Sequence, residues 1–405
     1  MSVMQIPLRL IPFSDGEQSI ISRICAEILI IGRRRILTDT IADRGVKMSI
    51  KKKFFGKLAD GTEIYRYTLK NKNGMKMKVM IYGGTVTELW VPDKNGTFTD
   101  IIGGFDSLQN YIDAPGSCQG ALIGRWANRI GKGQFEIDGK KYQLGVTAST
   151  GNHCHGGPVG FNKRVWTVEV INEDEPEIAL HLFSPDGDQD FPGNLTVTVT
   201  YKLTNENSWY IRYVATTDAP TIINLTQHAY FNLKGYAGGT VLDTELMIDA
   251  DTYLSTDCNL LPTGEIKKVE GTPFDFRTPK AIGRDIGEKN DDLLKATNVF
   301  NGYDHCFNFS NVTRESVKRA EAYDAKTGRV LEMYTNQPCV QLYTGNFLND
   351  EEHPFKGGYN QSVQTLFCLE TQCMPDSMNH EGFTNGILRP GEVYDYITEY
   401  KFSTK

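Results

Sequence analysis

Residues 224–233 read Asn-Leu-Thr-Gln-His-Ala-Tyr-Phe-Asn-Leu, and their side chains alternate between mostly apolar and hydrogen-bonding ones. The odd-numbered positions are mostly apolar: Leu225, Gln227, Ala229, Phe231 and Leu233. The even-numbered positions all carry hydrogen-bonding side chains: Asn224, Thr226, His228, Tyr230 and Asn232. A period of two is typical of a β-strand with one packed face and one polar face. The polar face suits a ligand rich in hydroxyl groups; the alternative is an amphipathic strand without a binding role.

Strand patterns continue through the chain from about residue 50. They cover residues 75–82, 86–91, 133–144, 195–203, 209–216, 330–334, 340–343, 364–371 and 393–402. Within residues 133–144, Asp138-Gly139 is a favoured two-residue hairpin turn. Short helices are expected only at residues 107–112 and 291–296. Many strands, Gly-rich turns and little helix predict an all-β protein, a large antiparallel β-sandwich.

Composition excludes several classes of partner. The 405 residues are 40% hydrophobic, which is enough for one large core. A formal net charge of −7 argues against nucleic acid as a partner, and no apolar run reaches the length of a membrane span. The eight cysteines are scattered and form no C-x-x-C pair. They therefore predict reduced thiols in a cytoplasmic protein.

The first 47 residues differ from the rest of the chain. Their apolar run precedes the arginine cluster at residues 33–35, whereas a signal peptide has its positive charge before the apolar run. Met48 opens a stretch that makes sense as a chain start. We expect residues 1–47 to be an N-terminal extension outside the fold and residues 48–405 to form one β-sandwich domain.

Two segments in the first half of the chain offer groups for ligand binding. Asn128 and Arg129 stand next to each other, and the fixed fork of arginine donors suits sugar hydroxyls or a carboxylate. His155 lies in the Gly-rich stretch 151–158, where the glycines leave room for the backbone to approach a ligand. The alternative for the arginine is a surface ion pair.

Three further candidates lie in the second half. Asp304 stands in an aromatic run, and Glu370 is the single carboxylate of an otherwise apolar strand. Such an acid is costly to bury unless it has a partner or a function. Gln341 alternates with Val340 and Leu342, which can direct its amide into a pocket.

The histidines also allow a metal site. His153 and His155 form an H-x-H pair, a spacing found in metal sites of β-barrels, and His228 and Glu370 can supply the remaining ligands. This alternative is a metal-dependent, cupin-like isomerase or dioxygenase.

Taken together, the motifs resemble those of the aldose 1-epimerase family, also called galactose mutarotases, and they occur in the family's order. The matching segments are Asn128-Arg129, residues 152–157, residues 224–233, Tyr303-Asp304, residues 341–346, residues 369–372 and Pro375-Asp376-Ser377. The resemblance implies a β-sandwich of the galactose mutarotase type. It also implies interconversion of the α and β anomers of hexoses such as glucose and galactose, without a metal or another cofactor.

The resemblance assigns roles to seven residues. His228 is similar to the family's general acid and Glu370 to its general base. The sugar hydroxyls would be bound by Asn128, Arg129, His155, Asp304 and Gln341. A small-molecule sugar is then the partner, with no nucleic acid and no membrane, and the protein is expected to be a monomer or dimer. A non-catalytic sugar-binding relative is disfavoured because binding alone needs neither an acid nor a base, and a hexose-6-phosphate enzyme would need a basic cluster that the sequence does not reveal.

Overall fold

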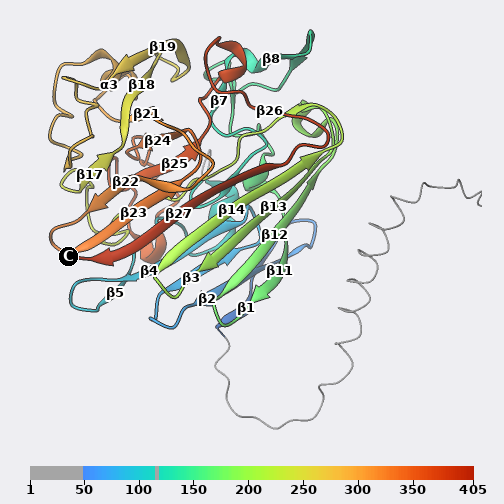
Figure 1. The fold of residues 1–405 in the computed structure, drawn as a ribbon. Coiled ribbons are helices and arrows are strands. Elements are labelled where there is room, and N and C mark those ends of the chain that lie inside the picture. The colour runs from blue at the N-terminus through green and yellow to red at the C-terminus, as the bar shows by residue number, and fades with distance from the viewer. Residues whose placement is uncertain (1–48, 115–117) are drawn as a thin grey trace, which may run out of the picture. The chain divides into compact units, whose positions relative to one another are not determined.

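The fold is built on a nine-stranded antiparallel sheet whose long strands lie side by side in Figure 1. The computed structural model describes residues 49–114 and 118–405, so the extension predicted over residues 1–47 lies outside the described residues. In spatial order the strands are β11 (Thr167–Asn172), β12 (Glu177–Ser184), β13 (Leu195–Leu203), β14 (Ser208–Thr217), β27 (Tyr394–Thr404), β23 (Arg329–Thr335), β22 (Val317–Tyr323), β17 (Glu245–Ile248) and β20 (Lys280–Ala281).

Two five-stranded antiparallel sheets complete the sandwich. The first contains, in order, β1 (Ile50–Lys57), β2 (Glu63–Lys70), β3 (Lys76–Met80), β4 (Thr85–Pro92) and β5 (Phe98–Asp100). The second contains β19 (Pro262–Lys268), β18 (Ala250–Thr256), β21 (Asp304–Phe309), β24 (Cys339–Tyr343) and β25 (Cys368–Gln372). The strand expected at residues 364–371 therefore begins only at Cys368.

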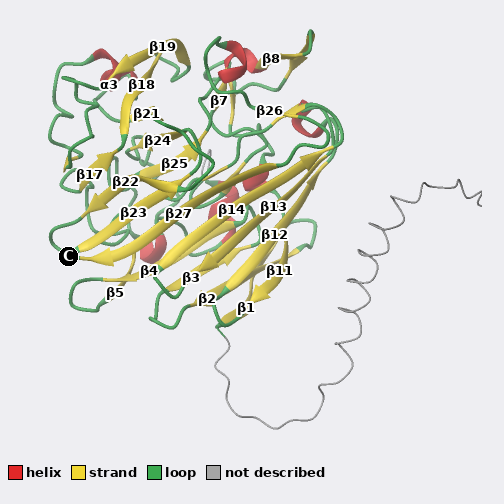
Figure 2. Cartoon of the chain, in the orientation of Figure 1, coloured by secondary structure: helices red, strands yellow, loops and turns green. Residues whose placement is uncertain are grey.

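The smaller elements follow local sequence rules. Four two-stranded pairs are β10 (His153–Cys154) with β7 (Arg129–Ile130), β15 (Thr221–Ile222) with β26 (Ile387–Leu388), β16 (Thr226–Gln227) with β6 (Leu122–Ile123), and β8 (Gln134–Ile137) with β9 (Lys140–Gln143). The β8–β9 hairpin turns at Asp138-Gly139, where both residues have positive φ, as a type I′ turn requires. Strands dominate the cartoon in Figure 2.

Both expected helices are present and capped. Helix α2 (Leu108–Asp113) begins after Ser107, whose side chain accepts a hydrogen bond from the Asn110 backbone N–H. Helix α3 (Asp291–Lys295) begins after Asn290, whose side chain accepts from two backbone N–H groups of its first turn. Such caps satisfy donors that the helix itself leaves free. No helix in residues 49–114 and 118–405 is long and apolar enough to cross a membrane.

The three large sheets share one hydrophobic core. Strand β13 buries every second side chain, from Leu195 to Leu203, and its intervening side chains are more exposed. The same core includes Met77 of β3 and Leu342 of β24. Side chains from all three sheets thus pack against one another, which confirms the predicted antiparallel β-sandwich.

The stretch at residues 224–233 is only partly a strand. Regular pairing is limited to β16 with β6, and Phe231 is held by single bridges to Ile102 and Phe367. The odd-numbered apolar side chains enter the core as expected. The even-numbered face is not uniformly wet, because Asn224 and Asn232 are buried and hydrogen-bond backbone groups of neighbouring segments. The expected ligand-facing surface is therefore reduced to His228 and Tyr230.

Candidate active site

Strand register places three of the predicted polar residues on one face of a sheet. In the pairing of β24 with β25, Gln341 lies opposite Glu370. In the pairing of β21 with β24, Asp304 lies opposite Tyr343, two residues from Gln341 and hence on the same face. Residues far apart in the sequence therefore come together because strands alternate with a period of two.

The β7–β10 pair contributes Asn128, Arg129 and His155. Asn128 and His155 both have positive φ, at 65° and 50°, and they lie opposite each other at one end of the pair. The His155 backbone N–H donates to the Asn128 carbonyl oxygen at 3.1 Å, and the Asn128 N–H donates to Nδ1 of His155 at 3.2 Å. These bonds orient the His155 ring, and because Nδ1 accepts, the neutral ring carries its hydrogen on Nε2.

His228 is fixed from both sides of its backbone. Its N–H donates to the Ala121 carbonyl oxygen at 2.9 Å, and its carbonyl oxygen accepts from the Gly120 N–H at 2.8 Å. The ring stacks on Tyr230, with centroids 4.9 Å apart and planes at 12°. Nδ1 lies 3.5 Å from Sγ of Cys368, which leaves Nε2 as the nitrogen that faces Glu370.

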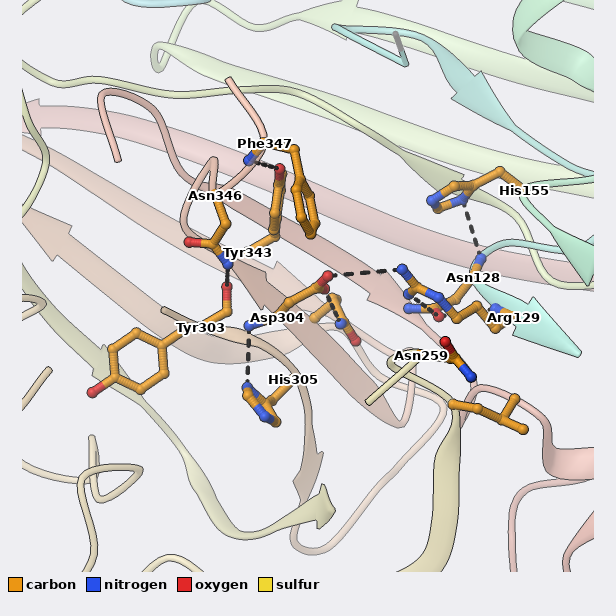
Figure 3. Close-up of polar contacts among 12 residues, drawn as sticks. Asn128, Arg129, His155, Asn259, Tyr303, Asp304, His305, Tyr343, Asn346 and Phe347 are labelled. Carbon is orange, nitrogen blue, oxygen red and sulfur yellow. Dashed lines mark hydrogen bonds and ion pairs between the residues drawn. The ribbon is translucent and has the colours of Figure 1, made fainter. Parts of the chain in front are cut away.

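These segments surround a cleft of about 260 Å³. Its walls are formed by Phe105, Ala114, Cys118, Gln119, Asn128, Arg129, Cys154, His155, His228, Tyr230, Asp304, Tyr343, Phe347, Leu348, Asp350, Gln361 and Glu370. Figure 3 shows Asp304 directed toward Arg129, and His155 hydrogen-bonded to the backbone of Asn128. Aromatic side chains and a few polar groups in a concave wall are typical of a small-molecule site.

Six of the seven predicted site residues line this cleft, and Gln341 does not. Nε2 of Gln341 donates to Oδ1 of Asp304 at 2.6 Å, and its own Oε1 accepts from Gln372 at 3.1 Å. The amide thus lies behind the carboxylate and orients it. The other oxygen of Asp304 lies 3.9 Å from Nη2 of Arg129.

The two proposed proton carriers meet at the base of the cleft. Nε2 of His228 lies 3.5 Å from Oε2 of Glu370, and both side chains are at least nine-tenths buried. In the described part of the chain, Oε2 of Glu370 has no hydrogen-bond partner. A carboxylate oxygen left without a protein donor is available to a ligand hydroxyl.

Burial shifts these groups strongly. It raises the pKa of Glu370 to about 8, although His155 in its protonated form and the Arg129 guanidinium oppose the shift. Burial, reinforced by His155, lowers the pKa of His228 well below its usual value. In the free enzyme at neutral pH the proton of the pair therefore resides on Glu370, and His228 is neutral. Burial also raises the pKa of the Asp304 carboxyl.

The metal alternative loses one of its four ligands. Nδ1–H of His153 donates to the Gly145 carbonyl oxygen at 2.8 Å, and the ring packs edge-on against Phe191 and does not line the cleft. Ligand atoms of His155, His228 and Glu370 do lie within 4.8 Å of one another. However, the Asn128 N–H on Nδ1 leaves Nε2 of neutral His155 protonated, and a protonated ring nitrogen cannot ligate a cation.

Some cleft residues were not singled out from the sequence. Tyr343 follows Gln341 by two residues on β24, so the period of two would have placed it on the same face. Gln119 and Phe347 lie in irregular segments, where no periodic signal marks a ligand-facing side chain.

Comparisons with known proteins show the family of the chain. The family model of aldose 1-epimerases matches residues 65–401. The galactose mutarotase of Homo sapiens is 39% identical over 355 residues, which cover 88% of this chain and 99% of the human protein. The aldose 1-epimerase of Escherichia coli K12 is 37% identical over 345 residues, 85% of this chain and 96% of that protein.

Solved structures of related proteins have the same fold. The galactose 1-epimerase of Lactobacillus acidophilus superimposes with a TM-score of 0.76 at 30% identity, over 88% of this chain and 99% of that chain. The combination of an antiparallel sandwich with these matches defines a carbohydrate isomerase. The chain belongs to the aldose 1-epimerase family, and it is a mutarotase that acts on a small sugar.

Proposed function

We propose that this mutarotase interconverts the α and β anomers of aldohexoses such as galactose and glucose, with Glu370 as general base and His228 as general acid. The observation that carries the assignment is the 3.5 Å approach of Nε2 of His228 to Oε2 of Glu370 in a buried cleft. The relatives named for galactose support the choice of hexose.

The chemistry needs two proton transfers. Glu370 removes the proton of the C1 hydroxyl, the C1–O5 bond breaks, and its electron pair stays on the ring oxygen. His228 protonates that oxygen through Nε2, and an aldehyde forms at C1. After half a turn about the C1–C2 bond, His228 takes the proton back as O5 attacks the other face of the aldehyde. Glu370 then returns its proton to O1, which becomes the new C1 hydroxyl.

Burial favours both transfers. A raised pKa makes the Glu370 carboxylate a stronger base than a carboxylate in water, and a lowered pKa makes the His228 imidazolium a stronger acid. Ring opening converts a buried ion pair into two neutral groups, which the low dielectric of the cleft prefers. While the sugar is in its open-chain form, Glu370 and His228 are therefore both neutral, which is the protonation state that the free enzyme prefers.

The remaining cleft residues hold the sugar. The Nε2–H of His155 and the guanidinium of Arg129 supply donors for O1 and the ring oxygen, while Asp304, oriented by Gln341, accepts from hydroxyls. Asn128 supplies an amide beside them. No metal takes part in this scheme.

The activity is tested by polarimetry on freshly dissolved α-galactose and α-glucose. With enzyme present, optical rotation should reach its equilibrium value much faster than in buffer alone. An unchanged rate for both sugars at micromolar enzyme would refute the proposed substrates.

Truncating Arg129 or His155 to Ala should weaken both sugar binding and turnover without unfolding the domain. Each residue lines the cleft, and hydrogen bonds to charged groups contribute about 1.5–3 kcal/mol. We therefore expect KM to rise by roughly tenfold or more. Polarimetric kinetics and thermal melting check this result, with Arg212→Ala on the exposed face of β14 as the control. Wild-type kinetics in both variants would show that the sugar binds elsewhere.

The rate should have a plateau between two pH limbs. Catalysis requires that Glu370 and His228 together hold one proton, and the pair loses that proton as pH rises through about 8. Below the lowered pKa of His228 the pair takes up a second proton. We therefore expect kcat/KM to fall above about pH 8 and again at acidic pH, well below the usual histidine range. The measurement is kcat/KM by polarimetry after subtraction of the spontaneous rate; a rate that keeps rising through pH 9 would contradict it.

A further inference from the structure

Gln119 is a buried polar side chain in the cleft wall that the scheme above does not use. It is 4% exposed and lines the cleft. Its Oε1 has no hydrogen-bond partner within residues 49–114 and 118–405. Rotating the amide by half a turn would only exchange which polar atom is left buried and unpartnered.

The backbone holds Gln119 firmly in this position. A turn closes through the Ala121 N–H, which donates to the Cys118 carbonyl oxygen at 3.0 Å. Gly120 follows Gln119 with φ at 72°, the left-handed value that a type II turn requires at this position. A Cβ on Gly120 would lie 2.2 Å from the Val86 carbonyl oxygen, so only glycine fits. The turn that contains Gln119 therefore packs closely against β4.

The same turn is joined directly to the proposed acid. The Gly120 N–H donates to the His228 carbonyl oxygen at 2.8 Å, and Ala121 accepts from the His228 N–H at 2.9 Å. Gln119 is therefore in fixed register with His228. Because the backbone on both sides of this turn is held, the Gln119 side chain starts from a fixed point in the cleft wall, from which its amide can contact one position on the sugar.

Two other acceptor atoms of the cleft residues are already engaged. Oδ1 of Asn128 accepts from the Arg129 backbone N–H at 2.8 Å, and Oδ1 of Asp304 accepts from Gln341. Glu370 is reserved for proton transfer in the scheme above. Gln119 thus offers a neutral acceptor that neither the protein nor the chemistry occupies.

We propose that Gln119 contacts the substrate and determines specificity, with its amide oxygen accepting a hydrogen bond from one hydroxyl of the bound sugar. The inference rests on the proposed function, because it requires an aldohexose in this cleft. An unpaired buried acceptor is unfavourable, and the sugar hydroxyl relieves that cost on binding. The site consequently rejects a sugar that lacks this hydroxyl, since the acceptor would remain buried and unpaired.

The test compares wild type with Gln119→Met, which keeps the side-chain length and removes the acceptor. Kinetics are measured by polarimetry on galactose and on its 2-, 3-, 4- and 6-deoxy analogues. We expect KM for galactose to rise roughly three- to tenfold, the size of one neutral hydrogen bond, with kcat almost unchanged because the contact is made equally in the ground and transition states. For one deoxy analogue the two proteins should have the same KM, which identifies the contacted hydroxyl.

Two further variants serve as a second test and as a control. Gln119→Asn retains a polar amide in the turn but withdraws it by one methylene, and it should show the same pattern. Gln109→Met, on the exposed side of α2, should behave as wild type. An unchanged KM for every sugar, an equal KM increase for galactose and all four analogues, or a lower kcat with a lower melting temperature and no change in KM would each overturn the inference. Wild-type protein that fails to accelerate mutarotation at all would refute the proposed function instead.

Discussion

Replacing Glu370 by Gln is expected to lower kcat by roughly 100-fold or more while sugar binding survives. The amide cannot accept the C1 proton. It does, however, resemble the neutral carboxyl group, which is the form that the raised pKa favours in the empty site at neutral pH. Since the substitution also removes a buried acid whose Oε2 lacks a partner in the described residues, the melting temperature should be maintained or raised.

Polarimetry measures kcat of this variant and calorimetry measures its sugar affinity. Glu136→Gln, an exposed position on β8, is the matched control and should keep wild-type values. A Glu370→Gln protein that retains more than about a tenth of kcat would mean that another group removes the proton, because a working base contributes at least ~10²-fold.

Replacing His228 by Asn should cost a similar factor, on the order of 10²-fold in kcat. Asn can hydrogen-bond to the ring oxygen but cannot protonate it. Because the acid and the base act in one ring-opening step, the double variant should be little worse than either single variant. His181→Asn, on the partly exposed face of β12, serves as the control.

Comparing the kcat losses of the single and double variants distinguishes two explanations. Additive losses would indicate that His228 and Glu370 act in separate steps, which the 3.5 Å distance between them argues against. A His228→Asn protein close to wild-type kcat would show that another donor, such as His155, protonates the ring oxygen.

Much of the fold follows from local sequence rules. The alternation of β13 and the Asp138-Gly139 turn predict their elements correctly, because one depends on the period of two and the other on backbone conformation. The stretch at residues 224–233 is different. Its apolar positions enter the core as expected, but outside β16 its bridges are isolated ones, made by Asn224 and Phe231 with segments from elsewhere in the chain. Such pairing depends on tertiary packing, which no local pattern encodes.

The candidate site shows the same division. Asp304 and Glu370 stand out as carboxylates in apolar strands, and the structure places both in the cleft. Gln341 is on the predicted face of β24, yet its amide turns to Asp304, because side-chain rotation is decided by the nearest partner rather than by strand phase. Gln119 lies in a turn whose direction depends on Gly120 and Val86, so its place in the wall emerges only from the fold.

The short distance between Nε2 of His228 and Oε2 of Glu370 also has a consequence for proton exchange between the enzyme and the solvent. In the proposed scheme one proton enters the pair and one leaves it in each half of the cycle, so the sugar and the two side chains together exchange nothing with the medium. The empty pair can redistribute its proton internally across the same short distance. Enzymatic turnover should accordingly be insensitive to buffer concentration, whereas the spontaneous reaction in water relies on buffer acids and bases to carry its protons.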